Sequence, residues 1–371
     1  MNIDNINLQY FRSYKSLSLD LSDGVNVFTG LNAQGKTNII EAVHFAALGI
    51  SHRTRNDSDL IYWDHPEAKI DIKFSKMGVE SQLVFFLKRG ARKRIELNGM
   101  PLTQKNLLGS LTMVLFSPED LLLVKGSPLL RRRFLDIELS QVSLVYYSEL
   151  VRYNKILSQR NSLLKKIRER SAPSDMLDMW DEQFAHSAAF IAAKRISGIQ
   201  RLNALAEQIH SGISGQKEEL SVKYIIHKYE DDLSTAKEAM QLEPWYKNML
   251  KSCRREDILR GSTSIGPHRD DISLEINGVN LKSFGSQGQQ RSSVLSLKLS
   301  ELEFLHSETG EYPVLLLDDV MSELDAARRD SLISILQQRH IQTLITATDR
   351  SLFSGRGENR FFTVQKGLVT E

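Results

Sequence analysis

The pattern of apolar and polar positions first predicts short strands and then a helix. In the first thirty residues the two kinds of position alternate in "INLQYF", "LSLDL" and "VNVFT", which favours strands separated by polar turns. The next stretch, "KTNIIEAVHFAALG", has helical spacing, with Ile39 and Val43 on one face and Gly49 as a stop. Asn-Gly pairs at 98–99 and 277–278 lie between alternating runs. Each pair predicts a tight hairpin, because both central positions of such a turn need positive φ.

From about residue 118 to residue 259 the pattern is mostly helical. Leu150, Tyr153 and Leu157 follow steps of three and four residues, and Arg160 interrupts the row. Runs typical of strands then return in "DISLEI", "YPVLLLDDV" and "IQTLITATD", with helical patterns between them. The change of pattern indicates that the middle of the chain is an insertion.

We therefore predict an α/β domain made of residues 1–117 and 260–371, with residues 118–259 inserted as a mainly α-helical second lobe. A length of 371 residues agrees, because it is long for one hydrophobic core and short for three. No apolar run approaches the roughly 20 residues that span a bilayer, and the first residues lack a secretory signal pattern. The single cysteine, Cys253, excludes an intrachain disulfide and suggests a reducing compartment. We expect a cytoplasmic protein with no membrane partner.

The string "GLNAQGKT" at residues 30–37 fits the phosphate-binding pattern G-x-x-x-x-G-K-[ST]. It lies between a predicted strand and a predicted helix, as a P-loop requires. Glycines let backbone N–H groups close around phosphate oxygens, and the helix N-terminus adds positive potential. Lys36 is expected to reach the β- and γ-phosphates of ATP, and Thr37 to bind Mg²⁺. The residues predicted to bind nucleotide are Gly30, Leu31, Asn32, Ala33, Gln34, Gly35, Lys36, Thr37 and Asn38.

A pair of acids follows the apolar run 314–317, which suits a buried parallel strand. Adjacent acids at such a strand end are costly unless a cation lies nearby. We expect Asp318 to lie on the Mg²⁺ side and Asp319 to polarise an attacking water as general base.

Two arginines are candidates to complete the pocket. Arg12 in "YFRSY" follows the first predicted strand and is a candidate to face the adenine or ribose, and Arg53 in "SHRTRND" is a candidate to face the phosphates. An arginine beside a turn is as often simply solvated, so both interpretations stay open.

The string "SFGSQGQQRSS" at residues 283–293 looks, taken alone, like a polar linker. Compared with the signature L-S-G-G-Q of ABC ATPases, it keeps Ser286, Gly288 and Gln289. A helical pattern follows at once, so Ser286 is expected at a helix N-terminus, which is favourable for anions. The string also precedes the acid pair, which is followed by "SELD" at 322–325, similar to the D-loop of ABC ATPases. This order favours a signature over a linker.

The order and wording of these motifs resemble the ABC-type ATPase heads of SMC and double-strand-break-repair proteins, and more specifically the RecF family. The resemblance extends from residue 10 to residue 349. It implies an ABC-type P-loop ATPase head of mixed sheets and helices, with the short helical insertion in place of the long coiled coil of SMC proteins. The strings that carry it are "YFRSY", "GLNAQGKTNIIEAV", "SHRT", "FSPEDLLLVKGSP", "RRRFLD", "QRNSLLK", "GPHRDD", "GSQGQQR", "LLLDDVMSELD" and "ITATD".

The resemblance implies an ATP-dependent DNA-binding protein of recombinational repair with a slow, DNA-stimulated ATPase. ATP closes two copies into a homodimer, and the signature of each copy completes the γ-phosphate site of the other. DNA is bound across the dimer without sequence preference, at single-strand gaps, at junctions of single- and double-stranded DNA and on duplex. RecO and RecR act with it to promote RecA loading. The implied signature residues are Ser286, Gln287, Gly288, Gln289 and Gln290, and the implied D-loop residues are Ser322 and Asp325.

Local charge supplies the candidates for DNA contact. The net charge is only +2, but residues 88–94 carry five basic side chains and no acid, and residues 152–170 carry seven against one acid. Contacts would be to phosphates, although such runs are often only solvated helix faces or hairpin tips. The candidates are Lys88, Arg89, Arg92, Lys93 and Arg94 on a predicted hairpin, and Lys165, Lys166, Arg168 and Arg170 on the helical insertion.

Two other classes of P-loop protein remain as alternatives. A soluble ATPase subunit of another ABC-type machine, such as a transporter, carries the same motifs, and stimulation by DNA rather than by a membrane partner would distinguish it. A small-molecule kinase or motor ATPase needs no signature, so the signature and "SELD" argue against that class.

Overall fold

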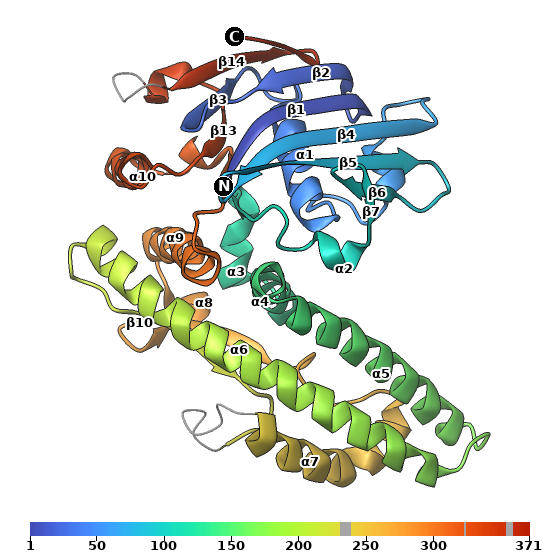
Figure 1. Ribbon diagram of the computed structural model, residues 1–371. Helices are drawn as coiled ribbons and strands as arrows, with labels where there is room; N and C mark the ends of the chain where they lie inside the picture. The colour runs from blue at the N-terminus through green and yellow to red at the C-terminus, as the bar shows by residue number, and fades with distance from the viewer. Residues whose placement is uncertain (231–238, 323, 354–358) are drawn as a thin grey trace. The chain divides into compact units, whose positions relative to one another are not determined.

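The computed structural model places most of the chain, and its described residues form two compact units (Figure 1). The first unit consists of residues 1–120 and 298–371, and the second of residues 121–297. No helix within the described ranges is long and apolar enough to cross a membrane. The structure describes residues 1–230, 239–322, 324–353 and 359–371.

One sheet of the first unit is antiparallel throughout, in the strand order β2-β1-β4-β5-β6-β7. Its β6–β7 turn is the predicted Asn-Gly hairpin, with φ of 52° at Asn98 and 77° at Gly99. All of its strands come from the first part of the chain, because hairpins connect most of them directly. They are β1 (Asn2–Phe11), β2 (Tyr14–Asp20), β4 (Glu67–Lys76), β5 (Val79–Lys88), β6 (Arg94–Leu97) and β7 (Met100–Leu102).

The second sheet of this unit has the order β15-β14-β3-β13-β12-β8, and only the β14–β15 pair is antiparallel. Every residue of β3, β12 and β13 is buried. Burial on both faces explains why β12 reads as a continuous apolar run before Asp318. The strands are β3 (Val25–Thr29), β8 (Met113–Phe116), β12 (Val314–Asp318), β13 (Thr343–Ala347), β14 (Arg360–Gln365) and β15 (Leu368–Thr370).

Helix α1 (Lys36–Leu48) packs against β4 and β5 of the first sheet and against β8, β12 and β13 of the second. Because it contacts both sheets, it is buried nearly all round and not only on the predicted face. Gly49 ends it in a left-handed conformation, as predicted. The other helical segments described in this unit are the short α2 (Gln104–Leu107), the later part of α9 (Gln287–Thr309), α10 (Ala326–Gln338) and the 3₁₀ turns Asp57–Leu60, Pro118–Leu121, Val320–Ser322 and Arg350–Phe353.

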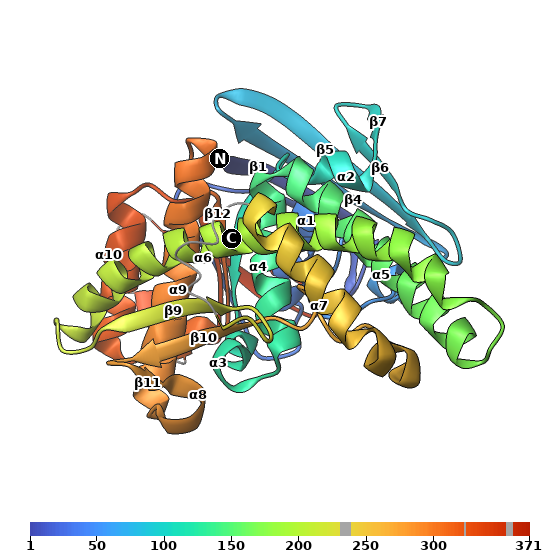
Figure 2. The same ribbon diagram turned by 90° about the horizontal axis from the view of Figure 1, so that it is seen from below.

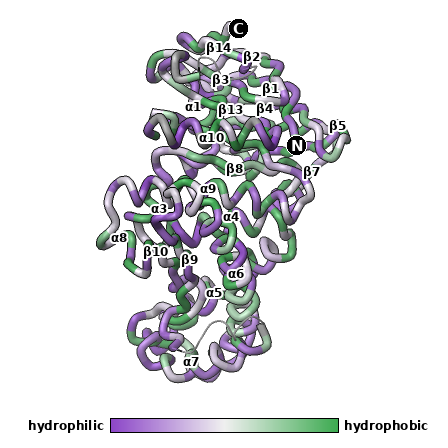
Figure 3. The backbone as a smooth tube through the Cα atoms, turned by 90° about the vertical axis from the view of Figure 1, so that its left-hand side faces the viewer, coloured by the Kyte–Doolittle hydropathy of each residue, from purple (hydrophilic) through white to green (hydrophobic). Residues whose placement is uncertain are grey.

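The second unit is mainly helical, and hydrophobic and hydrophilic positions alternate along its helices α5 and α6 (Figure 3). Helix α6 packs against α5 and α7, which explains its long buried stripe. The helices are α3 (Leu122–Lys125), α4 (Pro128–Val142), α5 (Leu144–Arg168), α6 (Leu177–Ser214), α7 (Ala239–Arg260), α8 (Leu281–Phe284) and the first part of α9 (Gln287–Thr309), with a 3₁₀ turn at Ser174–Met176.

The sequence analysis missed a strand in this unit. Strand β9 (Leu220–Ile225) lies inside the segment predicted as mainly helical, and it pairs with β10 (Asp271–Ile276), which in turn pairs with β11 (Val279–Asn280). Figure 2 shows β9 beside β10. Leu220, Val222 and Tyr224 are buried at alternate positions, which is the strand period. This pairing accounts for residues 260–297, assigned to the first domain from sequence, being grouped with the helical unit.

A buried arginine joins three helices of the second unit. Arg160 of α5 has no exposed side-chain surface, and it donates to Asp181 of α6 at 2.8 Å and to Asp257 of α7 at 2.8 Å. The residue that interrupts the apolar row in the sequence is therefore a bridge between helices. Breaking such a bridge leaves uncompensated buried charge, which is strongly destabilising.

We predict that Arg160→Met lowers the free energy of unfolding of the protein by about 3–5 kcal/mol, because Asp257 loses its buried cation. Urea denaturation followed by circular dichroism measures the change. Arg152→Met is the matched control, since the Arg152 side chain is 54% exposed and 3.7 Å from Glu149; that exposed pair contributes less than about 1 kcal/mol. Equal effects of the two substitutions would contradict the role given to Arg160.

Candidate nucleotide-binding site

The loop of residues 30–35 joins β3 to α1 and has the backbone conformation that a P-loop needs. Gly30 and Gly35 have φ of 151° and 116°, and a Cβ on Gly30 would lie 2.3 Å from the carbonyl oxygen of Val364. Glycine is required at both positions. In α1, all of which the structure describes, the first turn holds no acid and the N-cap Gly35 offers no side-chain bond. The N–H groups there are thus oriented for an anionic ligand.

The side chain of Lys36 lies within this loop. Its ammonium donates to the carbonyl oxygens of Gly30 at 2.6 Å and Leu31 at 3.0 Å. Burial lowers the pKa of Lys36, against the opposing influence of the Asp319 and Asp318 carboxylates. A cation held by loop carbonyls and facing two acids is placed to transfer its hydrogen bonds to phosphate oxygens.

Thr37 and Asp318, far apart in the sequence, meet directly. The Thr37 hydroxyl donates to Asp318 Oδ1 at 3.0 Å, and the Thr346 hydroxyl donates to the same oxygen at 2.7 Å. Thr346 is the residue paired with Asp318 in the parallel register of β12 and β13. The backbone N–H of Asp319 donates to Thr346 Oγ1 at 2.9 Å, so one hydroxyl aligns both acids.

These residues fit a magnesium ion. Mg²⁺ is usually bound by one or two carboxylates together with substrate phosphates and waters, and not by a cage of protein ligands. Thr37 and Asp318 supply one hydroxyl and one carboxylate at the foot of the P-loop. Among the residues that the structure describes, no group of three or more His, Cys, Asp or Glu side chains offers an alternative metal cage.

The residues implied as the D-loop follow the acids. The Ser322 hydroxyl donates to the Asp319 carbonyl at 2.8 Å. Asp325 accepts the backbone N–H of Arg328 at 2.9 Å and so caps the start of α10. Glu323, inside the same motif, lies outside the described residues. Both implied residues thus have local backbone partners that fix their positions.

Arg12 and Arg53 converge on a carboxylate that the sequence analysis did not single out. Glu41 of α1 has no exposed side-chain surface, and it accepts two bonds from Arg12, at 2.8 and 2.6 Å, and one from Arg53 at 3.1 Å. Burial by itself would raise the pKa of Glu41, but hydrogen bonds from Arg12 and Ser51 and the two nearby arginine charges bring that pKa below its usual value. Glu41 is therefore an anion that positions both arginines beside the P-loop helix.

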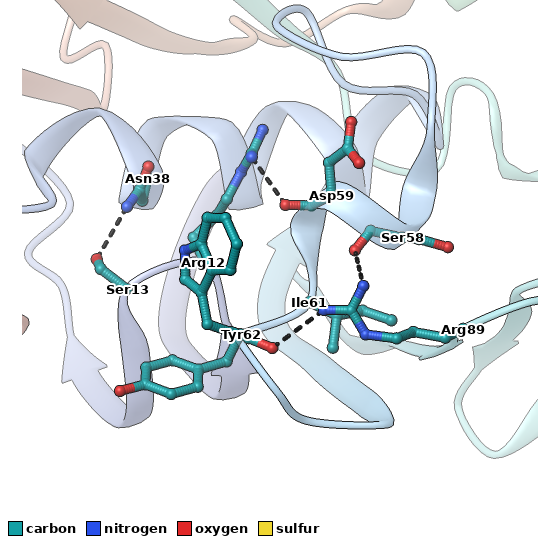
Figure 4. A pocket seen from close by; sticks show the side chains of 9 residues that line it. Arg12, Ser13, Asn38, Ser58, Asp59, Ile61, Tyr62 and Arg89 are labelled. Atoms are coloured by element: carbon teal, nitrogen blue, oxygen red, sulfur yellow. Dashed lines mark hydrogen bonds between the residues drawn. The ribbon is translucent and has the colours of Figure 1, made fainter.

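A pocket of 660 Å³ opens beside the start of α1, lined by Arg12, Asn38, Tyr62, Trp63 and Arg89 among others (Figure 4). The two guanidinium groups fix the wall of residues 58–65 through its carbonyl oxygens: Arg12 donates to Asp59 at 2.8 Å, and Arg89 donates to His65 at 2.9 Å. Asn38 is the residue after Thr37, so the pocket continues directly from the phosphate loop. Aromatic walls beside a phosphate site suit a nucleoside base.

The predicted signature forms the start of helix α9, and it is no flexible linker. Ser286 and Gln289 form a reciprocal capping box: the Gln289 N–H donates to the Ser286 hydroxyl at 3.2 Å, and the Ser286 N–H donates to Gln289 Oε1 at 2.9 Å. The buried Gln290 amide donates to the carbonyls of Leu281 and Gly285. Ser286 and Gln287 are exposed. An action of these residues on another copy of the chain stays a prediction.

The basic candidates for DNA contact differ in how far they are already engaged. On the β5–β6 hairpin, Arg89 holds the pocket wall, Lys93 donates to Gly49 O at 2.6 Å and to Asp57 at 2.9 Å, and Arg94 lies 3.4 Å from Glu96. Lys88 and Arg92 are exposed. The exposed candidates near the end of α5 are Lys165, Lys166, Arg168 and Arg170.

Sequence reasoning missed Glu41 and Thr346. Glu41 had a signal, since it is an acid inside the otherwise apolar helical pattern "NIIEAVHF". For Thr346 the signal lay only in strand register. Thr346 is the residue before the last of β13, and in the parallel pairing it lies opposite Asp318, the last residue of β12.

Comparison with known proteins gives a consistent result along the whole chain. Residues 2–369 match the family model described as the RecF/RecN/SMC N terminal domain. A protein of Acetivibrio thermocellus named DNA replication and repair protein RecF is 43% identical over 99% of both chains, and one of the same name from Clostridium novyi is 42% identical over 94% of this chain and 93% of its own.

Solved structures agree with these relatives. A structure of the recombination mediator protein RecF with ATP, in the RecFOR pathway, matches with a TM-score of 0.89 and 36% identity, over 100% of this chain and 97% of that one. An Smc head bound to the C-terminal winged-helix domain of ScpA matches with a TM-score of 0.58 at 16% identity, over 99% of this chain and 96% of that one, which shows a shared fold. The predicted class, an ATPase head of ABC type with a helical insertion, is confirmed.

We predict that Thr346→Val lowers the affinity for Mg²⁺ in the presence of ATP about 10- to 100-fold, because a hydroxyl that orients a metal-binding carboxylate is lost. Thr346→Ser keeps the hydroxyl and is the matched control. Titration of Mg²⁺ against ATP turnover measures the midpoint for each variant. An unchanged midpoint in Thr346→Val would show that Asp318 needs no such support.

Proposed function

Because this chain belongs to the RecF family, we propose that it is an ATP-dependent DNA-binding protein of replication and repair. The meeting of Thr37 with Asp318 at the foot of the P-loop carries the proposal, since it brings a phosphate loop and a metal-binding acid together. ATP with Mg²⁺ is the ligand that these groups suit. A solved relative named RecF with ATP supports the same assignment.

Phosphate binding uses the loop N–H groups, and Lys36 exchanges its bonds to Gly30 and Leu31 for oxygens of the β- and γ-phosphates. Thr37 and Asp318 would hold Mg²⁺, which would neutralise charge on the phosphates. Asp319 orients a water for attack on the γ-phosphate. Its side chain is one methylene shorter than the glutamate found in many ABC ATPases, which fits a slow hydrolysis that resets the protein.

We assign the nucleoside to the pocket beside α1. Tyr62 and Trp63 offer aromatic surfaces there, and Arg12 lines the same wall. Arg12 is fixed by Glu41 and by the Asp59 carbonyl, so it forms a rigid wall for the ribose or the base. Arg53, at 3.1 Å from Glu41, is directed by the same anchor and serves the phosphate side.

Closure of two copies completes the site. Ser286 and the helix start that it caps are exposed and can face the γ-phosphate bound to the P-loop of a second copy. The closed homodimer then binds DNA phosphates at gaps, junctions or duplex. RecO and RecR are the proposed partners in loading RecA, in keeping with the RecFOR pathway named for the solved relative. The sequence identity to the Acetivibrio thermocellus relative extends along both units, which argues against a transporter subunit.

We predict that Ser286→Arg abolishes ATP-dependent dimerisation while ATP binding to the single copy persists, because the longer side chain fills the space that the partner's γ-phosphate needs. Sedimentation velocity with and without ATP measures dimerisation, and a fluorescent ATP analogue measures binding. Ser252→Arg, on the exposed side of α7, controls for the added charge. Dimerisation of Ser286→Arg with ATP would refute the proposed action in trans.

We predict that Lys165→Gln with Lys166→Gln weakens DNA binding and lowers the slope of log affinity against log salt by about 2, because each phosphate contact contributes roughly 0.9. Fluorescence anisotropy with gapped DNA at several salt concentrations gives the slope. The pair Lys88→Gln with Arg92→Gln tests the hairpin in parallel. A loss of slope confined to the hairpin pair would transfer the DNA contact to that hairpin.

A further inference from the structure

Two hairpin turns of the first unit contact the outer side of the P-loop. The turn Lys366–Gly367 joins β14 to β15. The Lys366 N–H donates to Gln34 Oε1 at 2.7 Å, and the Gly367 N–H donates to the carbonyl oxygen of Gln34 at 3.3 Å. Tyr14 follows the β1–β2 turn, and its hydroxyl donates to the carbonyl oxygen of Gly35 at 3.0 Å. Two consecutive carbonyls of the loop thus have outside partners.

These bonds determine where the next N–H groups point. In a trans peptide the C=O and the following N–H are directed to opposite sides of the chain, and the described residues contain no cis peptide. When the Gln34 carbonyl points out to Gly367, the Gly35 N–H points into the loop. The Gly35 carbonyl accepts from Tyr14 and from the Asn38 N–H at 2.9 Å, and these two bonds together direct the Lys36 N–H in the same way. Both N–H groups are then aimed at the space that phosphate oxygens occupy.

The contacts are too close for other residues to replace the glycines. A Cβ on Gly367, where φ is 75°, would lie 2.7 Å from the carbonyl oxygen of Ser13. A Cβ on Gly35 would lie 2.9 Å from the Tyr14 hydroxyl oxygen. Gly367 therefore lies with its backbone against the Ser13 carbonyl, and Gly35 lies against the Tyr14 hydroxyl. An added side-chain atom at either position would displace the neighbouring turn.

We propose that Tyr14 and the Lys366–Gly367 turn are positioning residues for the nucleotide phosphates. They hold two peptide planes of the P-loop in the orientation that binds phosphate, so ATP does not have to order them. The inference rests on the proposed ATP site and adds residues outside its motifs. It also states which part of the ligand is affected: the polyphosphate, and not the nucleoside.

The test compares two glycines with the same backbone conformation. Gly367→Ala forces a Cβ against Ser13 and moves the turn off the loop, whereas Gly78→Ala places a Cβ in open space at the same φ of 75°. Calorimetric titration should show an ATP dissociation constant raised about tenfold in Gly367→Ala, the equivalent of one lost hydrogen bond. Gly78→Ala should stay within about twofold of the wild type.

Tyr14→Phe provides a second test that keeps the side-chain packing. It should raise the dissociation constants of ATP and ADP by a factor similar to that of Gly367→Ala, and it should leave the affinity for adenosine unchanged. Tyr312→Phe is the control, at a tyrosine whose hydroxyl contacts Glu303, and it should change none of these affinities. A loss that includes adenosine, or equal ATP affinity in wild type, Gly367→Ala and Tyr14→Phe, would overturn the inference. A wild type that binds no ATP would instead refute the proposed function.

Discussion

The nucleotide site depends on one hydrogen bond between residues 281 positions apart, from the Thr37 hydroxyl to the Asp318 carboxylate. The partners meet because β3, β13 and β12 are neighbours in one sheet. Their parallel register aligns Asp318 with Thr346, and Thr346 with Phe28. A slip of β12 by one residue would turn the Asp318 side chain to the other face of the sheet. Strand register is thus the constraint that keeps the acid beside the P-loop.

Buried charge is handled alike in the two units. Glu41 in the first unit and Arg160 in the second are fully buried, and each is shared by several partners of opposite charge from different elements. A shared ion has a desolvation cost that only good geometry offsets, so it favours one arrangement of its partners over others. In the first unit that arrangement holds Arg12 and Arg53 beside helix α1, which follows the P-loop. In the second it fixes three helices together.

Much of the fold and part of the site were predictable from sequence, because the signals concerned are local. The P-loop, the Asn-Gly hairpins, the α1 boundaries and the apolar run before Asp318 each follow from a few adjacent residues. Strand β9 was missed because its alternation is short and lies among helices, and its partner strand is far along the chain. Thr346, Glu41 and the Tyr14 contact depend on register and packing between distant segments. The one local sign among them is the acid Glu41 in an otherwise apolar helical pattern, and that sign does not show which residues it binds.

The sheet that carries the nucleotide site also imposes an order on biosynthesis. All strands of the antiparallel sheet lie within the first 102 residues, whereas among the described strands β3 has only β13 and β14 as neighbours and β8 has only β12. On the ribosome, β3 and β8 therefore have to wait for residues 314–365, a delay of roughly 10–65 s at typical rates of synthesis. During that time two apolar strands have unpaired edges. Until the later strands are made, those edges can pair with other chains.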